Sequence, residues 1–341
     1  METPLLEFAP TYANHATMRF HHPMGDTHTI DRVIFACRFG SRLHGTATET
    51  SDLDVKAVYV ADVNDILLGS YTPSVHVGTG VDALKNTPED VDIEFIEIRK
   101  FVSDTLKGQT YAIEMLFCDA ANTLYASPLW DELQGARARL ITKNIKPFTG
   151  YCVAQAKKYG LKGSRLKATE DVLEFIAGLD PKQDVASIVD SIPKNEYVFT
   201  VEKYFSHQQM PGTLLEINGK QFNMTNHLGE VSSVLTNLVH KYGARSHRAK
   251  DGMDYKALSH AYRCLFELKE LVTTGSITFP LKDREFLRDV KLGNVPHEQV
   301  QEELPALLEE MEALDSVLPD EPDHDFSAPF LLRAYRKCCT F

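Results

Sequence analysis

The sequence has no apolar stretch that approaches the roughly 18 residues needed for a membrane span. Its first ten residues, METPLLEFAP, lack the basic segment and following apolar segment of a secretory signal. Internal repeats and low-complexity segments are absent as well. These absences argue against a membrane or secreted protein, and we expect a globular protein of the cytoplasm.

Cysteine is sparse and shows no pattern. The six cysteines form no CxxC pair and do not have the spacing of a disulfide framework. They are Cys37, Cys118, Cys152, Cys264, Cys338 and Cys339. The pattern predicts reduced thiols in a reducing compartment, and it argues against a zinc site or a disulfide scaffold.

Positive charge is also in short supply. Lys and Arg total 36 against 48 Asp and Glu, so the net charge is −12, which argues against a broad surface that coats nucleic acid. Basic residues do cluster in 157–167 and 241–250, and each cluster can be a local binding patch or an ordinary solvated helix face. Residues 302–325 hold ten acids and no Lys or Arg, with a purpose that the sequence leaves open.

The length of 341 residues and a hydrophobic share of 43% predict two domains with a substantial core. We expect a leader over 1–29, a catalytic α/β half up to 125, and a mainly helical domain over 126–341, with the boundary near Ala126-Ser127-Pro128. Helices are predicted at 99–106, 147–158, 231–242, 255–273 and 305–314, the last with Pro305 in its first turn. Asn218-Gly219 predicts a tight hairpin turn within 214–222.

The most informative segment is GSRLHGTATETSDLD, residues 40–54. The apolar residues 31–39 before it predict a buried strand, so Gly40 and Ser41 follow a strand end. Gly40 permits a sharp turn and close approach of a ligand, Ser41 offers a hydroxyl, and a helix starting near Arg42 presents backbone N–H groups. This turn suits the phosphates of a nucleotide.

Two carboxylates follow on a second predicted strand. Alternation over 52–60 places Asp52 and Asp54 on one face, roughly 6.5 to 7 Å apart at the backbone. From there both can bind divalent metal ions of the kind that assist an in-line displacement at phosphorus. The alternative is a chance Asp-Leu-Asp on a solvent-facing strand end, and the Gly-Ser turn upstream makes the metal-binding interpretation the stronger one.

A Gly-Ser pair followed about ten residues later by Asp-x-Asp resembles the DNA polymerase β-like nucleotidyltransferase superfamily. The resemblance implies a third carboxylate on a neighbouring strand, which would complete the metal site and take the proton of the attacking hydroxyl. Residues 90–98 alternate in the manner of such a strand. Asp90, Asp92 and Glu94 lie on its polar face. We choose Asp92, because it is better embedded in the strand than Asp90 and fits the family's pattern of an acid, apolar residues and a helix start at 98–100, and we keep Glu94 as a competitor.

The segments 97–117 and 250–281 narrow the resemblance to the RNA-repair-pathway polymerase β family of bacterial and phage nucleotidyltransferases. The match covers about 31–120 and 240–300 and is weakest over 167–238. It implies an α+β fold, in which a mixed sheet with flanking helices is followed by a mainly α-helical domain. His44 departs from the aromatic residue that the family commonly has there, so the role of His44 is left open.

The family also implies the chemistry. Asp52, Asp54 and Asp92 would bind Mg²⁺ or Mn²⁺, and an NTP, with ATP as the first expectation, would bind at Gly40 and Ser41. The acceptor would be the hydroxyl at an RNA 3′ end, such as that of a tRNA-like molecule. For a phage-encoded protein the compartment would be the host cytoplasm. The nucleotide, the acceptor and the oligomeric state do not follow from the residues.

Four basic or protonatable residues are further candidates for binding phosphate. Arg42 follows the turn and can hold phosphate oxygens as a fork or make a structural contact. Lys256, His260 and Arg263 recur at helical spacing along one stripe, which can face the catalytic cleft. In the alternative interpretation that stripe lies on the surface, where Glu267 pairs with Arg263.

Two other functions stay open. The same chemistry with a Tyr, Ser or Thr hydroxyl as acceptor would make the protein a nucleotidylating enzyme that modifies proteins. The fold could instead serve as a module that binds nucleotide or RNA without turnover, although the presence of all three acids argues against this.

Overall fold

The computed structural model describes residues 6–12, 14–22, 25–79, 87–145, 148, 162–195, 197–205, 210–246, 255–312 and 314–338. The chain forms two units. Met1–Val153 and Ser259–Phe341 make up the first unit, and Ala154–Leu258 make up the second, so the second unit is an insertion into the first. Among the described helices, none is long and apolar enough to cross a membrane.

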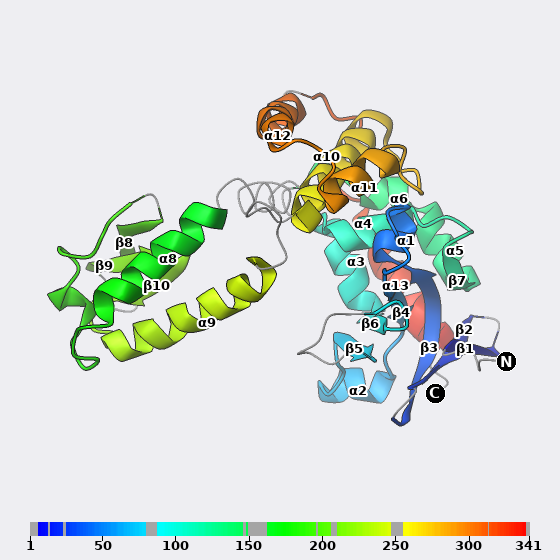
Figure 1. The fold of residues 1–341 in the computed structure, drawn as a ribbon. Coiled ribbons are helices and arrows are strands. Elements are labelled where there is room, and N and C mark those ends of the chain that lie inside the picture. The colour runs from blue at the N-terminus through cyan, green and yellow to red at the C-terminus, as the bar shows by residue number, and fades with distance from the viewer. Residues whose placement is uncertain are drawn as a thin grey trace. The chain divides into compact units, whose positions relative to one another are not determined.

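A seven-stranded mixed sheet forms the centre of the first unit (Figure 1). The strands run in the order β1 (Leu6–Tyr12), β2 (His15–His21), β3 (Thr27–Arg38), β4 (Leu53–Tyr59), β6 (Val91–Glu97) and β5 (Ser74–Gly78), and β7 (Thr123–Ala126) also pairs with β3. The pair β4 and β6 is parallel, whereas the other pairs are antiparallel. The first unit is therefore α+β with a mixed sheet, as the sequence predicts.

The two faces of β4 and β6 differ along their length. On one face Val55, Ala57, Ile93 and Phe95 are buried in a hydrophobic cluster, in agreement with the predicted alternation. The other face is polar at the start of each strand and apolar further on, where Val58 and Ile96 are fully buried. The start of this second face is therefore where side chains can reach a ligand.

Helices that follow the strands belong to the same unit. They are α3 (Ile98–Leu106), α4 (Thr110–Leu116) and α5 (Pro128–Gly135). Trp130 of α5 stacks on Phe35 of β3, with the two ring centroids 3.8 Å apart. The break at 126–128, which suggests a domain boundary in the sequence, is the join between β7 and α5. Ser127 caps α5 and Pro128 is its first residue, because these residue types begin helices as readily as they mark linkers.

The predicted leader over 1–29 is part of the sheet. Strand β1 pairs with β2, and β2 pairs with β3. Met18 and Phe20 are fully buried in the cluster that also contains Val55 and Phe95. Short strands separated by turns give a weak sequence signal, so this edge of the sheet went unrecognised.

The C-terminal stretch of the first unit is helical. It comprises α10 (Tyr255–Thr274, whose first turn lies in the second unit), α11 (Arg284–Leu292), α12 (His297–Glu312) and α13 (His324–Cys338). The helix predicted at 255–273 matches α10, and the helix predicted at 99–106 matches α3. The helix predicted to begin at Pro305 begins eight residues earlier, at His297, because Val300 and Leu304 are already buried helix residues. The described cysteines, Cys37, Cys118, Cys264 and Cys338, are buried thiols that form no disulfide among the described residues.

The second unit is smaller and is not purely helical. Two helices, α8 (Lys162–Ile176) and α9 (Leu228–Ser246), accompany a three-stranded antiparallel sheet of β8 (Val198–Phe205), β9 (Met210–Ile217) and β10 (Lys220–Asn223). The predicted hairpin is present, with Asn218 and Gly219 at φ values of 50° and 80° as its turn. Apart from Phe148, the helix predicted at 147–158 lies outside the described residues, as do the side chains of the two basic clusters.

We predict that Phe35→Ala lowers the free energy of unfolding of the first unit by about 3–5 kcal/mol, because it leaves a cavity under the Trp130 ring. Trp130 is the only tryptophan, so its fluorescence during urea unfolding reports on this unit. Leu67→Ala, at a side chain that is 78% exposed, is the control and should change the unfolding midpoint little. Equal effects of the two variants would contradict the packing described here.

Candidate functional site

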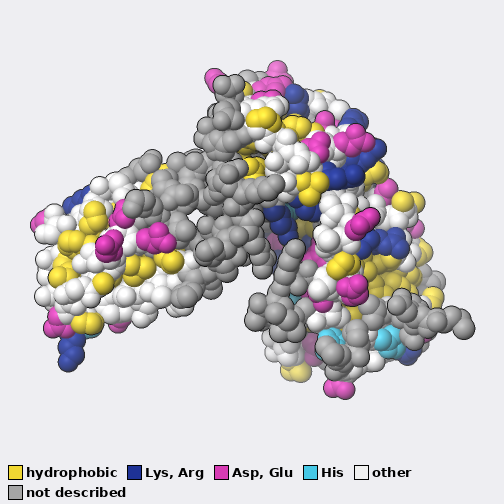
Figure 2. Space-filling model, viewed as in Figure 1, with side chains coloured by type: hydrophobic (Ala, Val, Ile, Leu, Met, Phe, Trp, Pro, Cys, Tyr) yellow, Lys and Arg dark blue, Asp and Glu magenta, His cyan; other side chains and the backbone are white. Residues whose placement is uncertain are grey.

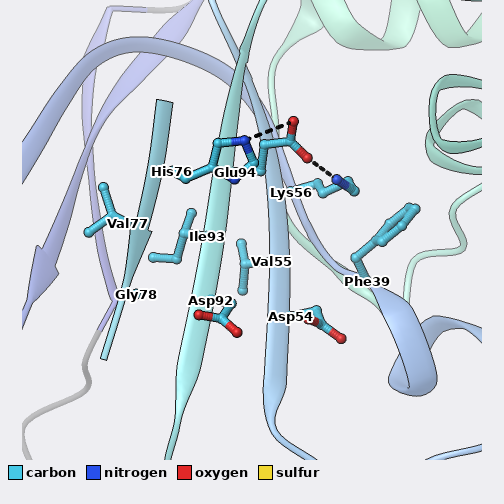
Figure 3. A pocket seen from close by; sticks show the side chains of 10 residues that line it. All are labelled: Phe39, Asp54, Val55, Lys56, His76, Val77, Gly78, Asp92, Ile93 and Glu94. Carbon is cyan, nitrogen blue, oxygen red and sulfur yellow. Dashed lines mark hydrogen bonds and ion pairs between the residues drawn. The ribbon is translucent and has the colours of Figure 1, made fainter. Parts of the chain in front are cut away.

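Three carboxylates meet where β4 and β6 begin. The parallel register pairs Asp54 directly with Asp92, and Asp52 precedes β4 by one residue. One ligand oxygen from each of Asp52, Asp54 and Asp92 lies within 4.8 Å of the others. Figure 3 shows the Asp54 and Asp92 side chains on the same side of the two strands. Three acids this close could share a divalent cation, because oxygen donors are the ligands that Mg²⁺ and Mn²⁺ prefer.

Two glycines make room for these carboxylates. Gly40 has a φ of 58°, and a Cβ there would overlap the carboxylate of Asp54. A Cβ on Gly78, in β5, would overlap the carboxylate of Asp92 in the same way. From the sequence we expect Gly40 to permit the close approach of a ligand. In the structure the group that approaches Gly40 is the acid itself, and the role of Gly78 follows only from the register of β5 on β6.

The turn between β3 and β4 is tied to the backbone of Asp54. The short helix α1 (Gly40–His44) follows Phe39, whose N–H donates to the Asp54 carbonyl over 2.8 Å. The Ser41 Oγ is buried and has no hydrogen-bond partner among the described residues. A buried hydroxyl without a partner is unfavourable in the folded protein, so Ser41 is suited to a ligand that supplies an acceptor.

Arg42 is exposed and contacts the loop that leads to Asp52. Its Nε and Nη2 donate to the carbonyls of Asp52 and Ser51, each over 3.4 Å. These long bonds favour the structural alternative for Arg42, although a guanidinium has five N–H donors and retains capacity for another acceptor.

A pocket of about 430 Å³ begins at Asp54 and Asp92. Its lining consists of Phe39, Asp54, Val55, Lys56, His76, Val77, Gly78, Asp92, Ile93 and Glu94 (Figure 3). At the end away from the carboxylates, Lys56 forms an ion pair with Glu94, which also accepts a hydrogen bond from Ser74 over 2.9 Å. Burial alone would raise the pKa of Glu94, but Lys56 lowers it below its usual range.

This ion pair bears on the choice between Asp92 and Glu94. Glu94 lies two residues after Asp92 on β6, where the register places it opposite Lys56. Because Lys56 forms an ion pair with Glu94, the charge of Glu94 is already balanced. The group of carboxylates that could hold a metal contains Asp92 and not Glu94 among the described residues. The geometry thus favours Asp92 as the third acid.

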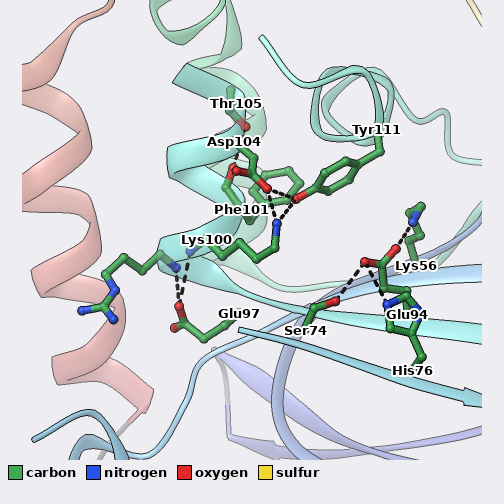
Figure 4. A network of polar contacts seen from close by, with 11 residues as sticks. Lys56, Ser74, His76, Glu94, Glu97, Lys100, Phe101, Asp104, Thr105 and Tyr111 are labelled. Carbon is green, nitrogen blue, oxygen red and sulfur yellow. Dashed lines mark hydrogen bonds and ion pairs between the residues drawn. The ribbon is translucent and has the colours of Figure 1, made fainter. Parts of the chain in front are cut away.

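Lys56 also connects the pocket to a second polar network, which the sequence does not reveal. Its Nζ lies 5.0 Å from the centre of the Phe39 ring and 5.2 Å from the centre of the Tyr111 ring. The Tyr111 hydroxyl donates to Asp104 over 2.5 Å, and Lys100 pairs with the same carboxylate (Figure 4). Burial and the hydrogen bond to Asp104 raise the pKa of Tyr111, so this hydroxyl stays protonated.

The three residues of the basic stripe predicted on α10 differ in burial. Arg263 is buried, whereas His260 is half-buried and Lys256 is exposed. Arg263 forms ion pairs with Glu114 and Glu267, and its Nη1 lies 3.0 Å from the Nε2 of His44. The predicted pair of Arg263 with Glu267 exists, but it is buried rather than on the surface. Its guanidinium is therefore engaged by protein groups, which leaves its predicted role toward phosphate without support.

His44, Glu114, Arg263 and Glu267 form one buried network, which we call the Arg263 network. Burial lowers the pKa of His44 to about 4, and the charge of Arg263 adds to this effect, so the imidazole is neutral. Because a guanidinium only donates, the His44 Nε2 accepts the bond from Arg263 and the ring proton is on Nδ1. His44, Glu114 and Glu267 could form a metal-binding set by position, but Arg263 already supplies the cation that they share.

The two glutamates of the Arg263 network carry different charges. Burial would raise the pKa of Glu114, but the adjacent Arg263 lowers it well below its usual range. Burial raises the pKa of Glu267 despite Arg263, and the charge of Glu114 adds to the increase. One ionised carboxylate thus balances one guanidinium, and the network joins α1 to α4 and α10 without an uncompensated charge. It fixes the far end of the turn that carries Gly40 and Ser41, which gives His44 an anchoring role.

We predict that Gly78→Ala weakens binding of Mn²⁺ about 10-fold or more, because the added methyl displaces the Asp92 carboxylate. Electron paramagnetic resonance titration of free Mn²⁺ measures this directly. Gly135→Ala is the matched control, since a Cβ there meets no atom within 4 Å and neither glycine has a left-handed φ. Equal affinities in the two variants would refute the assignment of Asp92 to a metal site.

Acid should destabilise the protein through His44. The folded pKa of about 4 lies below the ordinary value of 6.5, so the stability that depends on neutral His44 is complete above pH 6.5 and is lost as the pH falls toward 4. We expect His44→Phe to reduce the loss of unfolding free energy between about pH 8 and about pH 5 by about 2 kcal/mol. His76→Phe, at an exposed ring, should keep the pH dependence of the wild type, and the comparison uses urea unfolding at each pH.

Two sequence comparisons relate this chain to known proteins. Residues 13–173 match the model of the RNA repair pathway DNA polymerase beta family. A relative from Enterobacteria phage T4, named as an uncharacterized 38.9 kDa protein in the nrdC-mobD intergenic region, is 33% identical over 328 residues, which span 89% of this chain and 97% of the relative.

A solved structure, that of a nucleotidyltransferase-like protein from Exiguobacterium sibiricum, aligns over 82% of this chain and 68% of its own with 6% identity. Its TM-score of 0.23 is too low to carry an argument. The family match covers the turn and all three carboxylates, and the phage relative extends over most of the chain. The chain therefore belongs to the RNA repair pathway DNA polymerase beta family, one of the polymerase β-like nucleotidyltransferase families.

Proposed function

We propose that the protein is a metal-dependent nucleotidyltransferase that moves an NMP from an NTP to an acceptor hydroxyl, with ATP as the expected donor and an RNA 3′ end as the expected acceptor. The observation that carries the proposal is the convergence of Asp52, Asp54 and Asp92 beside the Gly40-Ser41 turn. The family, whose description refers to RNA repair, supports the choice of RNA.

The carboxylate group fits a divalent metal. All three residues offer hard oxygen ligands within 4.8 Å of one another, and Gly40 and Gly78 leave the space that their carboxylates need. Asp52, Asp54 and Asp92 would hold Mg²⁺ or Mn²⁺. Such ions, when bound, neutralise phosphate charge and stabilise the attacking and leaving oxygens of an in-line displacement.

The chain's own residues then have distinct roles. The Ser41 hydroxyl, which is buried with no partner in the described part of the chain, donates to the β- or γ-phosphate, and Gly40 allows the chain to turn there. Asp92 accepts the proton of the acceptor hydroxyl. That oxygen forms a bond to the α-phosphorus, the bond from this phosphorus to the bridging oxygen breaks, and pyrophosphate leaves. The pocket next to Asp92 provides the space that an acceptor group needs beside this carboxylate.

Two alternatives differ in the acceptor or in turnover. A protein hydroxyl would use the same three acids, and a binding module would use none of them chemically. The retention of all three acids disfavours the binding module, because a protein without turnover has no need for three close carboxylates that repel one another.

The test incubates the wild type with each of four α-labelled NTPs, Mg²⁺ or Mn²⁺, total RNA and cell extract. We expect label on RNA, and we expect Asp54→Asn to abolish it with little loss of folding stability, since removing one of three crowded carboxylates relieves repulsion. Glu89→Gln removes an exposed acid three residues before Asp92 and should retain full activity.

The other outcomes are equally distinct. Label on protein would replace the RNA acceptor by a protein one. Activity of Asp54→Asn equal to that of the wild type would refute the proposed metal site. Absence of label on any acceptor, together with no pyrophosphate release, would favour the binding module.

A further inference from the structure

Helix α11 carries a basic stripe that is separate from the one considered on α10. Arg284, Arg288 and Lys291 are spaced by four and then three residues, which places them on one side of the helix. Glu285 and Asp289 are also four residues apart, and their positions fall on a different side of α11. The three cations are thus grouped, although the protein as a whole has a net charge of −12. Figure 2 shows Lys and Arg side chains gathered in the part of the view where α11 lies.

This stripe packs against the end of the nucleotide turn. The Arg288 Nη2 donates to the Gly45 carbonyl over 3.3 Å, and the Lys291 Nζ donates to the Thr46 carbonyl over 3.4 Å. Arg284 packs against Gly45, because a Cβ added to this glycine would meet the Arg284 Cδ at 2.9 Å. The segment before α11 is tied to the same place, because the Leu281 N–H donates to the His44 carbonyl over 3.2 Å.

The two arginines have donor capacity that the protein does not use. Among the described residues, neither Arg284 nor Arg288 forms an ion pair, and their side chains donate long hydrogen bonds to backbone carbonyls, of Leu281 over 3.4 Å and of Gly45 over 3.3 Å. The Arg288 Nε is buried and has no partner among these residues, and the same is true of the Ser41 Oγ at the other end of the turn. Unsatisfied donors at both ends of one short turn are expected where an anion with several oxygen atoms binds.

We propose that Arg284, Arg288 and Lys291 of α11 form a site that binds phosphate groups of the substrates beside the turn 40–46. This proposal rests on the proposed function for the identity of the substrates. Phosphate fits better than a carboxylate ligand, because two guanidinium forks and an ammonium on one stripe match an anion with several oxygens and more than one charge. The phosphates belong either to the backbone of an RNA acceptor or to the tail of the NTP.

A purely structural role is the competing explanation. Cations near the C-terminal end of a helix are stabilising, and α1 ends at His44, directly before the two carbonyls that Arg288 and Lys291 contact. If stabilisation of this end were their only role, neutral residues at 284 and 288 would lower thermal stability and leave phosphate binding unchanged.

The test compares the double variant Arg284→Gln, Arg288→Gln with the wild type. Polarisation of a labelled single-stranded RNA and calorimetry with inorganic triphosphate, both without divalent metal, give two dissociation constants. We expect at least one to rise about 10-fold, and where RNA is affected the slope of log affinity against log salt should fall by about 1 to 2. The control, Lys269→Gln with Lys282→Gln, removes two cations that pair with acids outside the stripe and should bind as the wild type does.

The pattern of loss identifies the phosphate source. Weaker RNA binding alone assigns the stripe to the acceptor backbone, and weaker triphosphate binding alone assigns it to the nucleotide. Unchanged constants, or a wild type that binds neither probe, would overturn the proposal. If the Gln variant does not fold, Arg284→Lys with Arg288→Lys retains the charge but removes the forks, and it should weaken binding several-fold.

Failure of this site and failure of the proposed function are distinguishable. Asp54→Asn removes a negative charge from the carboxylate group and should not weaken metal-free binding of either probe. A protein that binds phosphate through α11 but never transfers label would refute the proposed function and leave the α11 site standing. Transfer of label by the wild type, together with unchanged dissociation constants in the double variant, would support the proposed function and refute the α11 site.

Discussion

The parallel pairing of β4 with β6 is the constraint on which the site depends. It brings Asp54 level with Asp92, and one strand repeat further it brings Lys56 level with Glu94. Like charges thus meet at the first level and opposite charges at the second. The ion pair at the second level balances its own charges and holds the strands together, whereas the first level places two carboxylates side by side, as a site for a divalent cation requires. A shift of one residue would send these side chains to the buried face.

The turn is the second element that must be held in place, and the Arg263 network does this from the opposite end. A five-residue helix makes few hydrogen bonds of its own, so its position depends on what its side chains contact. His44 contributes a neutral ring that packs near Phe39 and Phe279 and accepts a bond from Arg263. The ring therefore fills the space of an aromatic residue and also supplies an acceptor, which explains why a histidine can stand there.

Local patterns predicted the parts of the site that are close in sequence. Residues 40–54 contain the turn and two of the acids, and alternation alone placed Asp52 and Asp54 on one strand face. The sequence selected Asp92 but kept Glu94 as a competitor, because the register that places Lys56 opposite Glu94 is contained in no local pattern. To predict that Arg263 is buried, one must know which face of its helix is covered by the rest of the protein. The spacing does not tell this, because an Arg–Glu pair four residues apart occurs both on surfaces and in cores. The sequence places the boundary between domains at 126–128, but these residues cap helix α5. The second unit is instead an insertion, Ala154–Leu258, and no local pattern marks its two ends.

The insertion also bears on how the protein is made. His44 and Arg263 are 219 positions apart, so a ribosome must synthesise the whole second unit before the anchor of the turn can form. Contacts at such separation raise the contact order of the first unit and slow the last step of its folding. The inserted segment has its own core and can fold while it emerges. A nascent chain therefore contains all three acids long before the turn beside them is secured, and a fully supported site is a property of the finished polypeptide.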